Sequence, residues 1–241
     1  MSTAGLLVIG NEILSGKVVD TNSPYLASEL RALGVDLRRI LTIPDEIDVI
    51  AEETRKMSQA YDFVFTSGGI GPTHDDITMD GVARAFGREL VLNQGMCDRI
   101  ERAQGKSANA SQRKMALIPE GARLIDAGDL WFPVIIVENV HIFPGIPELL
   151  RKKFDSIRDR FSGEPFHLKQ VYVTRHESDI AQPLHDLLGE FPKLMLGSYP
   201  RLREEDYRVL LTLESRDPDY LVRALDSLLA RLPRDYIRRV E

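Results

Sequence analysis

The chain has 241 residues, of which 43% are hydrophobic and 28% are charged, and its formal net charge is -6 at pH 7. This length holds one large domain or two smaller ones. Nucleic acids and anionic membranes both attract basic surfaces, so an acidic chain leads us to expect neither as a partner. Its single cysteine, Cys97, excludes an internal disulfide, and the apolar run at residues 6–9 is too short for a signal peptide, so we expect a cytoplasmic protein.

The first two thirds of the chain alternate between strand and helix patterns. Short apolar runs predict strands at residues 4–9, 35–43 and 61–66, and apolar residues at helical spacing predict helices at 21–33, 45–58 and 76–87. After these, the sequence predicts further helices at 94–104 and 109–117, short strands at 123–125, 134–137 and 140–143, and a helix opened by residues 144–150. Such alternation is typical of a mostly parallel sheet with helices on both faces, so residues 1–163 are predicted to form a three-layer α/β sandwich.

Glycine and proline at residues 162–165 predict a linker. The patterns after it predict a β-α-β-β-α-β order, with strands at 167–174, 193–198, 207–215 and 236–240 and helices at 177–189 and 217–231. This order is that of a ferredoxin-like fold, so residues 166–241 are predicted to form a small α+β domain. Such a unit can bind RNA through sheet aromatics, but the acidic composition favours packing or a dimer interface.

The segment TSGGIGPTHDDIT, residues 66–78, connects the third strand to a helix. Gly68, Gly69 and Gly71 allow the backbone to approach a ligand closely, and the free N–H groups of a helix start favour an anion. Ser67 and Thr73 add hydroxyl donors. This pattern is neither GxGxxG nor a P-loop, and a purely structural turn with Asp76 capping its helix is the alternative.

The paired aspartates, Asp75 and Asp76, would repel a phosphate. Two like unit charges about 4 Å apart repel each other by roughly 4 kcal/mol near a protein surface. The start of a helix stabilises an anion by only about 0.3–1 kcal/mol at exposed sites. A bound cation resolves the conflict, because Mg²⁺ is commonly held by one or two carboxylates and the phosphates of the ligand. Glu12 and Asp45 follow the first two strands and should reach the same sheet edge, although each alone is explained as a loop acid or a helix cap.

At these residues the sequence resembles the molybdopterin-binding domain family, which includes competence/damage-inducible protein A and the N-terminal domain of animal FAD synthase. The resemblance depends on GNEILSGKVVDTN (10–22), IPDE (43–46), TSGGIGPTHDDIT (66–78), ALIPEGARLI (116–125) and FPGIPELL (143–150). The stretch with LGSYPRL (196–202) and TLES (212–215) resembles the segment that follows this domain in FAD synthase.

The resemblance implies a metal site formed by Glu12, Asp45 and Asp76, with Mg²⁺, Mn²⁺ or Co²⁺ as the divalent metal, and it leaves open a monovalent cation. It also implies a ligand site for a nucleotide or pterin phosphate. The ligand-binding residues expected from it are Gly10, Asn11, Asn22, Ser67, Gly68, Gly69, Gly71, Thr73, Thr78, Pro144, Gly145 and Glu148. Asn11 departs from the acid that the family often carries there, so one negative charge is missing.

Members with this layout are associated with metal-dependent cleavage of ADP-ribose or FAD at the pyrophosphate. Our first hypothesis is therefore such a hydrolase, with Asp75, Asp76 and Lys17 as catalytic residues and Asp75 orienting or deprotonating the attacking water. The alternatives are a binding module without catalysis and a molybdopterin adenylyltransferase-like enzyme. We expect a homo-oligomer, either a dimer or a trimer.

Trp131 and Phe132 stand just before Pro133 and are expected to pack a loop, with stacking on a ligand ring as the alternative. Cys97 is expected to be buried and inert.

Overall fold

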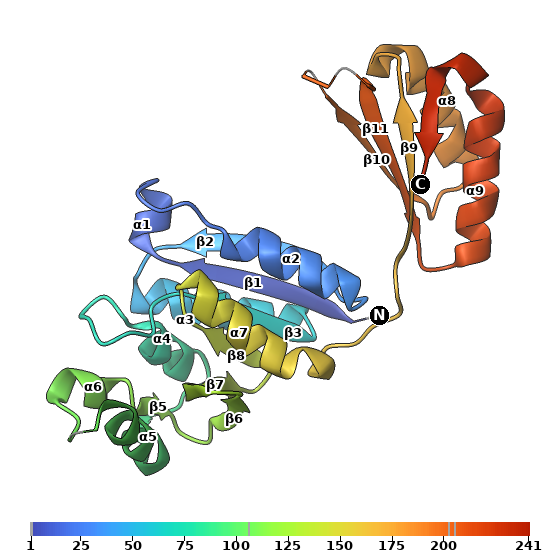
Figure 1. Ribbon diagram of the computed structural model, residues 1–241. Coiled ribbons are helices and arrows are strands. Elements are labelled where there is room, and N and C mark those ends of the chain that lie inside the picture. Colours follow the sequence, from blue (N-terminus) through green and yellow to red (C-terminus); the bar gives the residue numbers. More distant parts are fainter. Residues whose placement is uncertain (1, 106, 202, 205) are drawn as a thin grey trace. The chain divides into compact units, whose positions relative to one another are not determined.

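A computed structural model of the chain describes residues 2–105, 107–201, 203–204 and 206–241. The chain forms two compact units, Met1–Gly163 and Glu164–Glu241 (Figure 1). Each unit has a hydrophobic core made of its own residues. Over the described part of the chain, no helix combines the length and apolar character needed to cross a membrane.

The first unit contains a six-stranded sheet in the order β2-β1-β3-β8-β7-β6. Its parallel strands are β1 (Thr3–Ile9), β2 (Asp36–Ile43), β3 (Phe63–Ser67) and β8 (Val140–Phe143). Two further strands, β7 (Leu130–Val137) and β6 (Arg123–Ala127), run antiparallel at one side. The carboxyl ends of β1, β2 and β3 therefore meet at one edge, where α/β proteins bind their ligands.

Helices cover both faces of this sheet, which confirms the predicted three-layer sandwich. Because side chains alternate along a strand, Leu6 and Val8 of β1 join one core while Leu7 and Ile9 join the other. The first core is completed by α2 (Asn22–Ala32) and α7 (Pro147–Ile157), the second by α3 (Ile47–Ala60) and α4 (Thr78–Ala85). Each fully buried Leu or Ile contributes about 1.5–3 kcal/mol to folding.

Some short elements were not anticipated. They are α1 (Asn11–Leu14), the paired strands β4 (Leu90–Leu92) and β5 (Leu117–Pro119), and the 3₁₀ turns η1 (Arg158–Arg160) and η2 (Arg234–Tyr236). The expected helices between β4 and β5 are present as α5 (Gln94–Gln104) and α6 (Ala110–Lys114). The expectation of a loop at Trp131 and Phe132 is wrong, because both residues lie in β7.

The second unit is a four-stranded antiparallel sheet in the order β10-β11-β9-β12, with two helices that share its core. Its elements are β9 (His167–Val173), α8 (Glu177–Glu190), β10 (Met195–Pro200), β11 (Val209–Ser215), α9 (Pro218–Arg231) and β12 (Ile237–Val240). The first strand thus lies between the third and the fourth, which is the ferredoxin-like arrangement predicted from the sequence.

Tyr172, an aromatic residue of β9 on this second sheet, is engaged within the unit. The guanidinium of Arg239 lies 3.7 Å from the ring centroid of Tyr172, and Tyr207 meets the same tyrosine edge-to-face at 4.9 Å. Tyr172 therefore does not offer an open ring face of the kind on which RNA-binding sheets stack bases.

Candidate functional site

The glycine turn leaves β3 in a conformation that requires glycine. Gly68 and Gly69 have φ angles of 111° and 65°, and a Cβ at Gly68 would lie 2.1 Å from the carbonyl oxygen of Ile9. Thr78, at the start of α4, donates its hydroxyl to the Gly68 carbonyl at 2.9 Å and its N–H to the Gly69 carbonyl at 3.0 Å. Thr78 is fully buried, so the structure places it behind the turn as a residue that holds it.

Unpaired backbone donors follow at the front of the turn. Among the residues that the structure describes, the N–H groups of Gly69, Ile70 and Gly71 donate to no acceptor. Gly145 and Ile146 lie at the start of α7, and a Cβ at Gly145 would lie 3.4 Å from Gly68 Cα. Unpaired N–H groups beside a helix start form a site suited to an anion such as phosphate.

The turn opens onto a cavity of about 400 Å³. This is within the range of small-molecule sites, about 300–1,000 Å³. Its lining has three parts: the glycine turn with Gly145 and Ile146, the carboxylates of Glu12 and Asp76, and a largely apolar wall. That wall consists of Met115, Leu130, Trp131, Phe132, Leu149 and Lys153.

The three predicted metal ligands are not equivalent. Glu12 follows β1 in α1 and folds back over Gly10, so that a Cβ at Gly10 would lie 2.5 Å from Glu12 Oε1. Glu12 and Asp76 line the same cavity, whereas Asp45 does not and instead accepts the backbone N–H of Asn11 at 2.8 Å. Within the described ranges, no three acidic, histidine or cysteine side chains lie close enough together to hold a metal.

Two carboxylates that line one cavity with unpaired N–H groups are the kinds of group used by a hydrated Mg²⁺-type ion that takes its remaining ligands from phosphate and water. The expectation that Asp45 caps a helix is wrong, because α3 begins after Glu46 and no side chain caps it. The helix-cap alternative for Asp76 is also wrong, since α4 begins after Ile77.

Thr73 holds both aspartates of the loop. Its N–H and hydroxyl contact Asp76 Oδ2 at 2.8 and 2.5 Å, and its hydroxyl also lies 2.5 Å from Asp75 Oδ1. Lys114 of α6 donates to the Thr73 carbonyl. The hydrogen bond from the Thr73 hydroxyl lowers the pKa of Asp75, and the Asp75 side chain is 61% exposed and outside the cavity. The geometry therefore does not support Asp75 as the base that deprotonates water.

Asn22 connects three elements behind the turn. From the first turn of α2, its side-chain amide donates to Ser67 Oγ at 2.9 Å and to the Gly145 carbonyl at 2.8 Å. Its Oδ1 is buried and has no hydrogen-bond partner among the described residues. Asn22 and Ser67 line a second, smaller hollow of about 90 Å³ together with Glu12 and Asp20. They are thus close to the main cavity and hold its backbone in place, and their predicted role in ligand binding stays a prediction.

Two predicted residues lie away from the cavity. Lys17 is exposed in the loop after α1, and Glu148 is exposed on the first turn of α7. Neither lines the main cavity or the smaller hollow. Pro144 does line the main cavity, next to Gly145.

Most of the apolar wall was not predicted as part of the site, although stacking of Trp131 and Phe132 on a ligand ring was the alternative expectation for those two residues. Phe132 is buried, while Trp131 is partly exposed. Lys153 is buried beside them, and burial lowers the pKa of its ammonium from 10.5 to about 7. The sequence pattern that could have identified Lys153 is its spacing, because it lies four residues after Leu149 and four before Ile157, within the apolar stripe of α7.

The fold and the site define an α/β protein with a ligand site suited to an anion at the carboxyl edge of its sheet. The chain belongs to the family described as probable molybdopterin binding domain, whose pattern matches residues 5–162. Residues 165–241 match the middle domain of FAD synthase. Both matches confirm the resemblance found in the sequence.

Relatives agree with this assignment. A protein of Archaeoglobus fulgidus is 39% identical over 198 residues, covering 81% of this chain and 85% of the relative. A probable FAD synthase of Caenorhabditis elegans is 32% identical over 254 residues, covering 94% of this chain and 49% of the relative. The chain thus spans about half the length of that nematode relative.

A solved structure also resembles the chain. It is the protein CinA, of unknown function, from Thermoplasma acidophilum, with a TM-score of 0.62 and 29% identity. The match covers 66% of this chain and 98% of that one.

Proposed function

We propose that this chain hydrolyses the pyrophosphate linkage of a nucleotide such as ADP-ribose or FAD, in a reaction that requires a divalent metal. The oxygen of a water molecule bonds to one phosphorus, the bridging P–O bond breaks, and AMP leaves together with a second monophosphate. The observation that carries this proposal is the single cavity shared by unpaired N–H groups, two carboxylates and an aromatic wall.

Each part of the cavity has a task in this reaction. The N–H groups of Gly69, Ile70 and Gly71 bind and orient a phosphate, and they stabilise charge that develops on its oxygens. Glu12 and Asp76 would hold the metal, which when bound supplies Lewis acidity and an activated water. Trp131 and Phe132 bind the organic part of the substrate and exclude bulk water from the linkage.

The experiment is an assay of purified protein with ADP-ribose or FAD in the presence of Mg²⁺, Mn²⁺ or Co²⁺, with AMP measured by chromatography. We expect AMP release with at least one of these ions and loss of release in EDTA. Restoring the ion should restore release, which controls for damage by the chelator.

A binding module without catalysis is the second candidate. It is favoured by the engagement of Asp76 with Thr73 and by the absence, within the described residues, of a preassembled group of three metal ligands. Saturable binding of AMP or FMN without AMP release under any of the three metals would select this candidate. The expected homo-oligomer, a dimer or a trimer, stays a prediction.

A further inference from the structure

Lys153 is a buried charged residue for which the proposed reaction has no task. It is 2% exposed, its Nζ donates to the Pro133 carbonyl at 2.6 Å, and it lies 4.2 Å from the centroid of the Phe132 ring. An ammonium group has three N–H donors, and the part of the chain that the structure describes supplies one acceptor. A buried charge is costly unless it is paired. The two remaining N–H donors of Lys153 therefore require an acceptor atom, which a ligand bound in the cavity would supply.

The position of Lys153 separates it from the phosphate end of the cavity. The glycine turn packs against the start of α7, where Gly145 faces Gly68. Lys153 lies six residues beyond Pro147, which is about 9 Å along the helix axis. Its neighbours there are Pro133 and Phe132 of β7, so it contributes to the aromatic end of the lining.

We propose that Lys153 recognises the carbonyl edge of an oxo-substituted fused ring, the isoalloxazine of a flavin nucleotide, whose phosphate lies at the glycine turn. This inference rests on the proposed function and names the preferred substrate class of the same site. The ring packs against Trp131 and Phe132, and Nζ donates to one of its carbonyl oxygens. The structure thus assigns Lys153 as a specificity-determining residue that selects FAD over ADP-ribose.

The choice of ring follows from hydrogen-bond chemistry. An ammonium only donates, so the ring edge that meets it must accept. A carbonyl oxygen offers two lone pairs and suits the two remaining N–H donors of Lys153. Adenine offers only ring nitrogens as acceptors, each with a single lone pair, so it would leave one of these two donors unpaired. A site built for a hydrogen-bonding group discriminates strongly against a ligand that leaves its buried donors unpaired.

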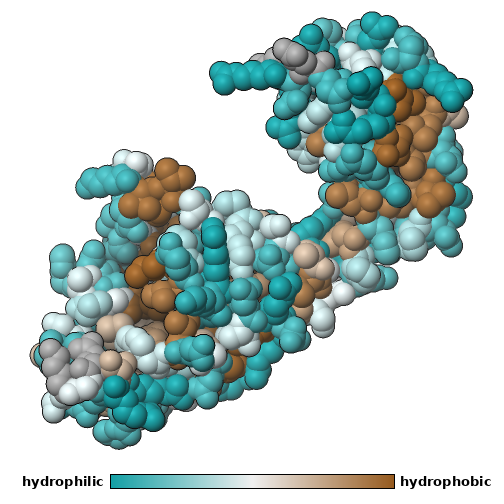
Figure 2. All heavy atoms as spheres, in the orientation of Figure 1, coloured by the Kyte–Doolittle hydropathy of each residue, from teal (hydrophilic) through white to brown (hydrophobic). Residues whose placement is uncertain are grey.

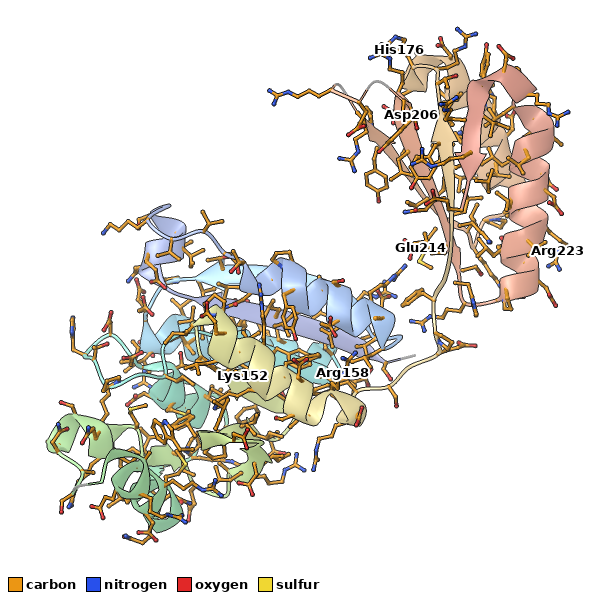
Figure 3. The ribbon with its side chains drawn as sticks, viewed as in Figure 1. Lys152, Arg158, His176, Asp206, Glu214 and Arg223 are labelled. Atoms are coloured by element: carbon orange, nitrogen blue, oxygen red, sulfur yellow. The ribbon has the colours of Figure 1, made fainter. Side chains whose placement is uncertain are left out.

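The test compares the affinities of FMN and AMP, two monophosphates that differ in the ring and in the sugar, by calorimetry at pH 6, below the lowered pKa of Lys153. The variants are Lys153→Met, which keeps apolar volume without a donor, and Lys152→Met as a matched control. Lys152 precedes Lys153 on α7 but is exposed (Figure 3). We expect wild type to bind FMN about tenfold or more tightly than AMP, and Lys153→Met to weaken FMN by about 10–100-fold while AMP changes little.

Other outcomes decide against the inference. Equal affinities of wild type for FMN and AMP would overturn it, as would an equal effect of Lys153→Met on both ligands. AMP binding by Lys153→Met reports an intact site, and Lys153→Gln, which keeps donors, should retain part of the preference for FMN. Because binding requires no turnover, an FMN preference without AMP release from FAD would refute the proposed hydrolysis and leave this inference standing.

Discussion

The acidic residues at the glycine turn differ in what they contact, although they are neighbours in the sequence. Asp76 lines the cavity and accepts the N–H of Thr73, while Asp75 lies outside the cavity with an exposed carboxylate. The position of a carboxylate relative to the cavity, more than its charge alone, therefore decides whether it can take part in binding a metal or a ligand.

This difference predicts opposite outcomes for two matched substitutions. Asp76→Asn keeps an oxygen for Thr73 but removes the negative charge, so turnover should fall by about 100-fold or more if Asp76 holds a catalytic metal. Asp75→Asn should retain turnover within about threefold, because this side chain does not line the cavity. Steady-state rates and melting temperatures of both variants check this. A larger loss in Asp75→Asn than in Asp76→Asn would reverse the assignment.

Lys153 makes stability depend on pH in a predictable direction. Its pKa is lowered from 10.5 to about 7, so between these values the unfolded chain binds more protons than the folded one. Stability should therefore rise with pH across this window, by about 5 kcal/mol at 1.36 kcal/mol for each pH unit. Urea unfolding of wild type and Lys153→Met from pH 6 to 10 measures this. The advantage of Lys153→Met should be largest near pH 6 and shrink by pH 10, and a constant difference would contradict the lowered pKa.

At the scale of elements, the sequence predicts what depends on pattern and misses what depends on tertiary contacts. The β1-α2-β2-α3-β3 succession follows from apolar periodicity, and so do the elements of the second unit. In contrast, β4 and β5 have three residues each and pair across the segment that contains α5 and α6, so no local pattern marks them. Residue type alone predicts a solvated Lys153, whereas its spacing within the apolar stripe of α7 and the packing of that helix on β7 agree with its burial.

The glycine turn provides a test at this scale. Gly69 and Gly87 have similar φ angles, 65° and 62°, but a Cβ at Gly69 would lie 2.3 Å from Thr78 Oγ1, whereas a Cβ at Gly87 would meet nothing within 4 Å. Gly87→Ala should therefore cost only backbone strain, about 1–2 kcal/mol. Gly69→Ala should cost about 1–3 kcal/mol more, because it also crowds the hydroxyl that holds the turn. Urea denaturation gives both values, and equal costs would show that Thr78 does not restrain Gly69.

At the scale of the whole molecule, the two units differ in what they contribute to the site. All residues that line the main cavity belong to the unit Met1–Gly163. The unit Glu164–Glu241 has its own core, which includes Val171, Leu211 and Leu225. On the first unit, hydrophobic residues gather at α1 and the segment that follows it (Figure 2), where Leu14, Val18 and Val19 are each at least half exposed.

Separate cores predict that the units fold separately. A fragment of residues 164–241 should unfold cooperatively in urea, because it retains its whole core. A fragment of residues 1–163 should bind AMP within about threefold of the full chain, since it retains the whole cavity lining. Circular dichroism and calorimetry measure the two properties. Loss of AMP binding in a folded fragment 1–163 would mean that the second unit completes the site.

Hydrolysis of a nucleotide pyrophosphate in ¹⁸O-labelled water is the most direct measurement of the proposed function. We expect that FAD with a divalent metal yields AMP and FMN, that one of the two phosphates gains a single ¹⁸O atom by mass spectrometry, and that Asp76→Asn yields neither product. A binding module would release no AMP, and an adenylyltransferase would pass AMP to an acceptor other than water. Either result would contradict the proposed hydrolysis.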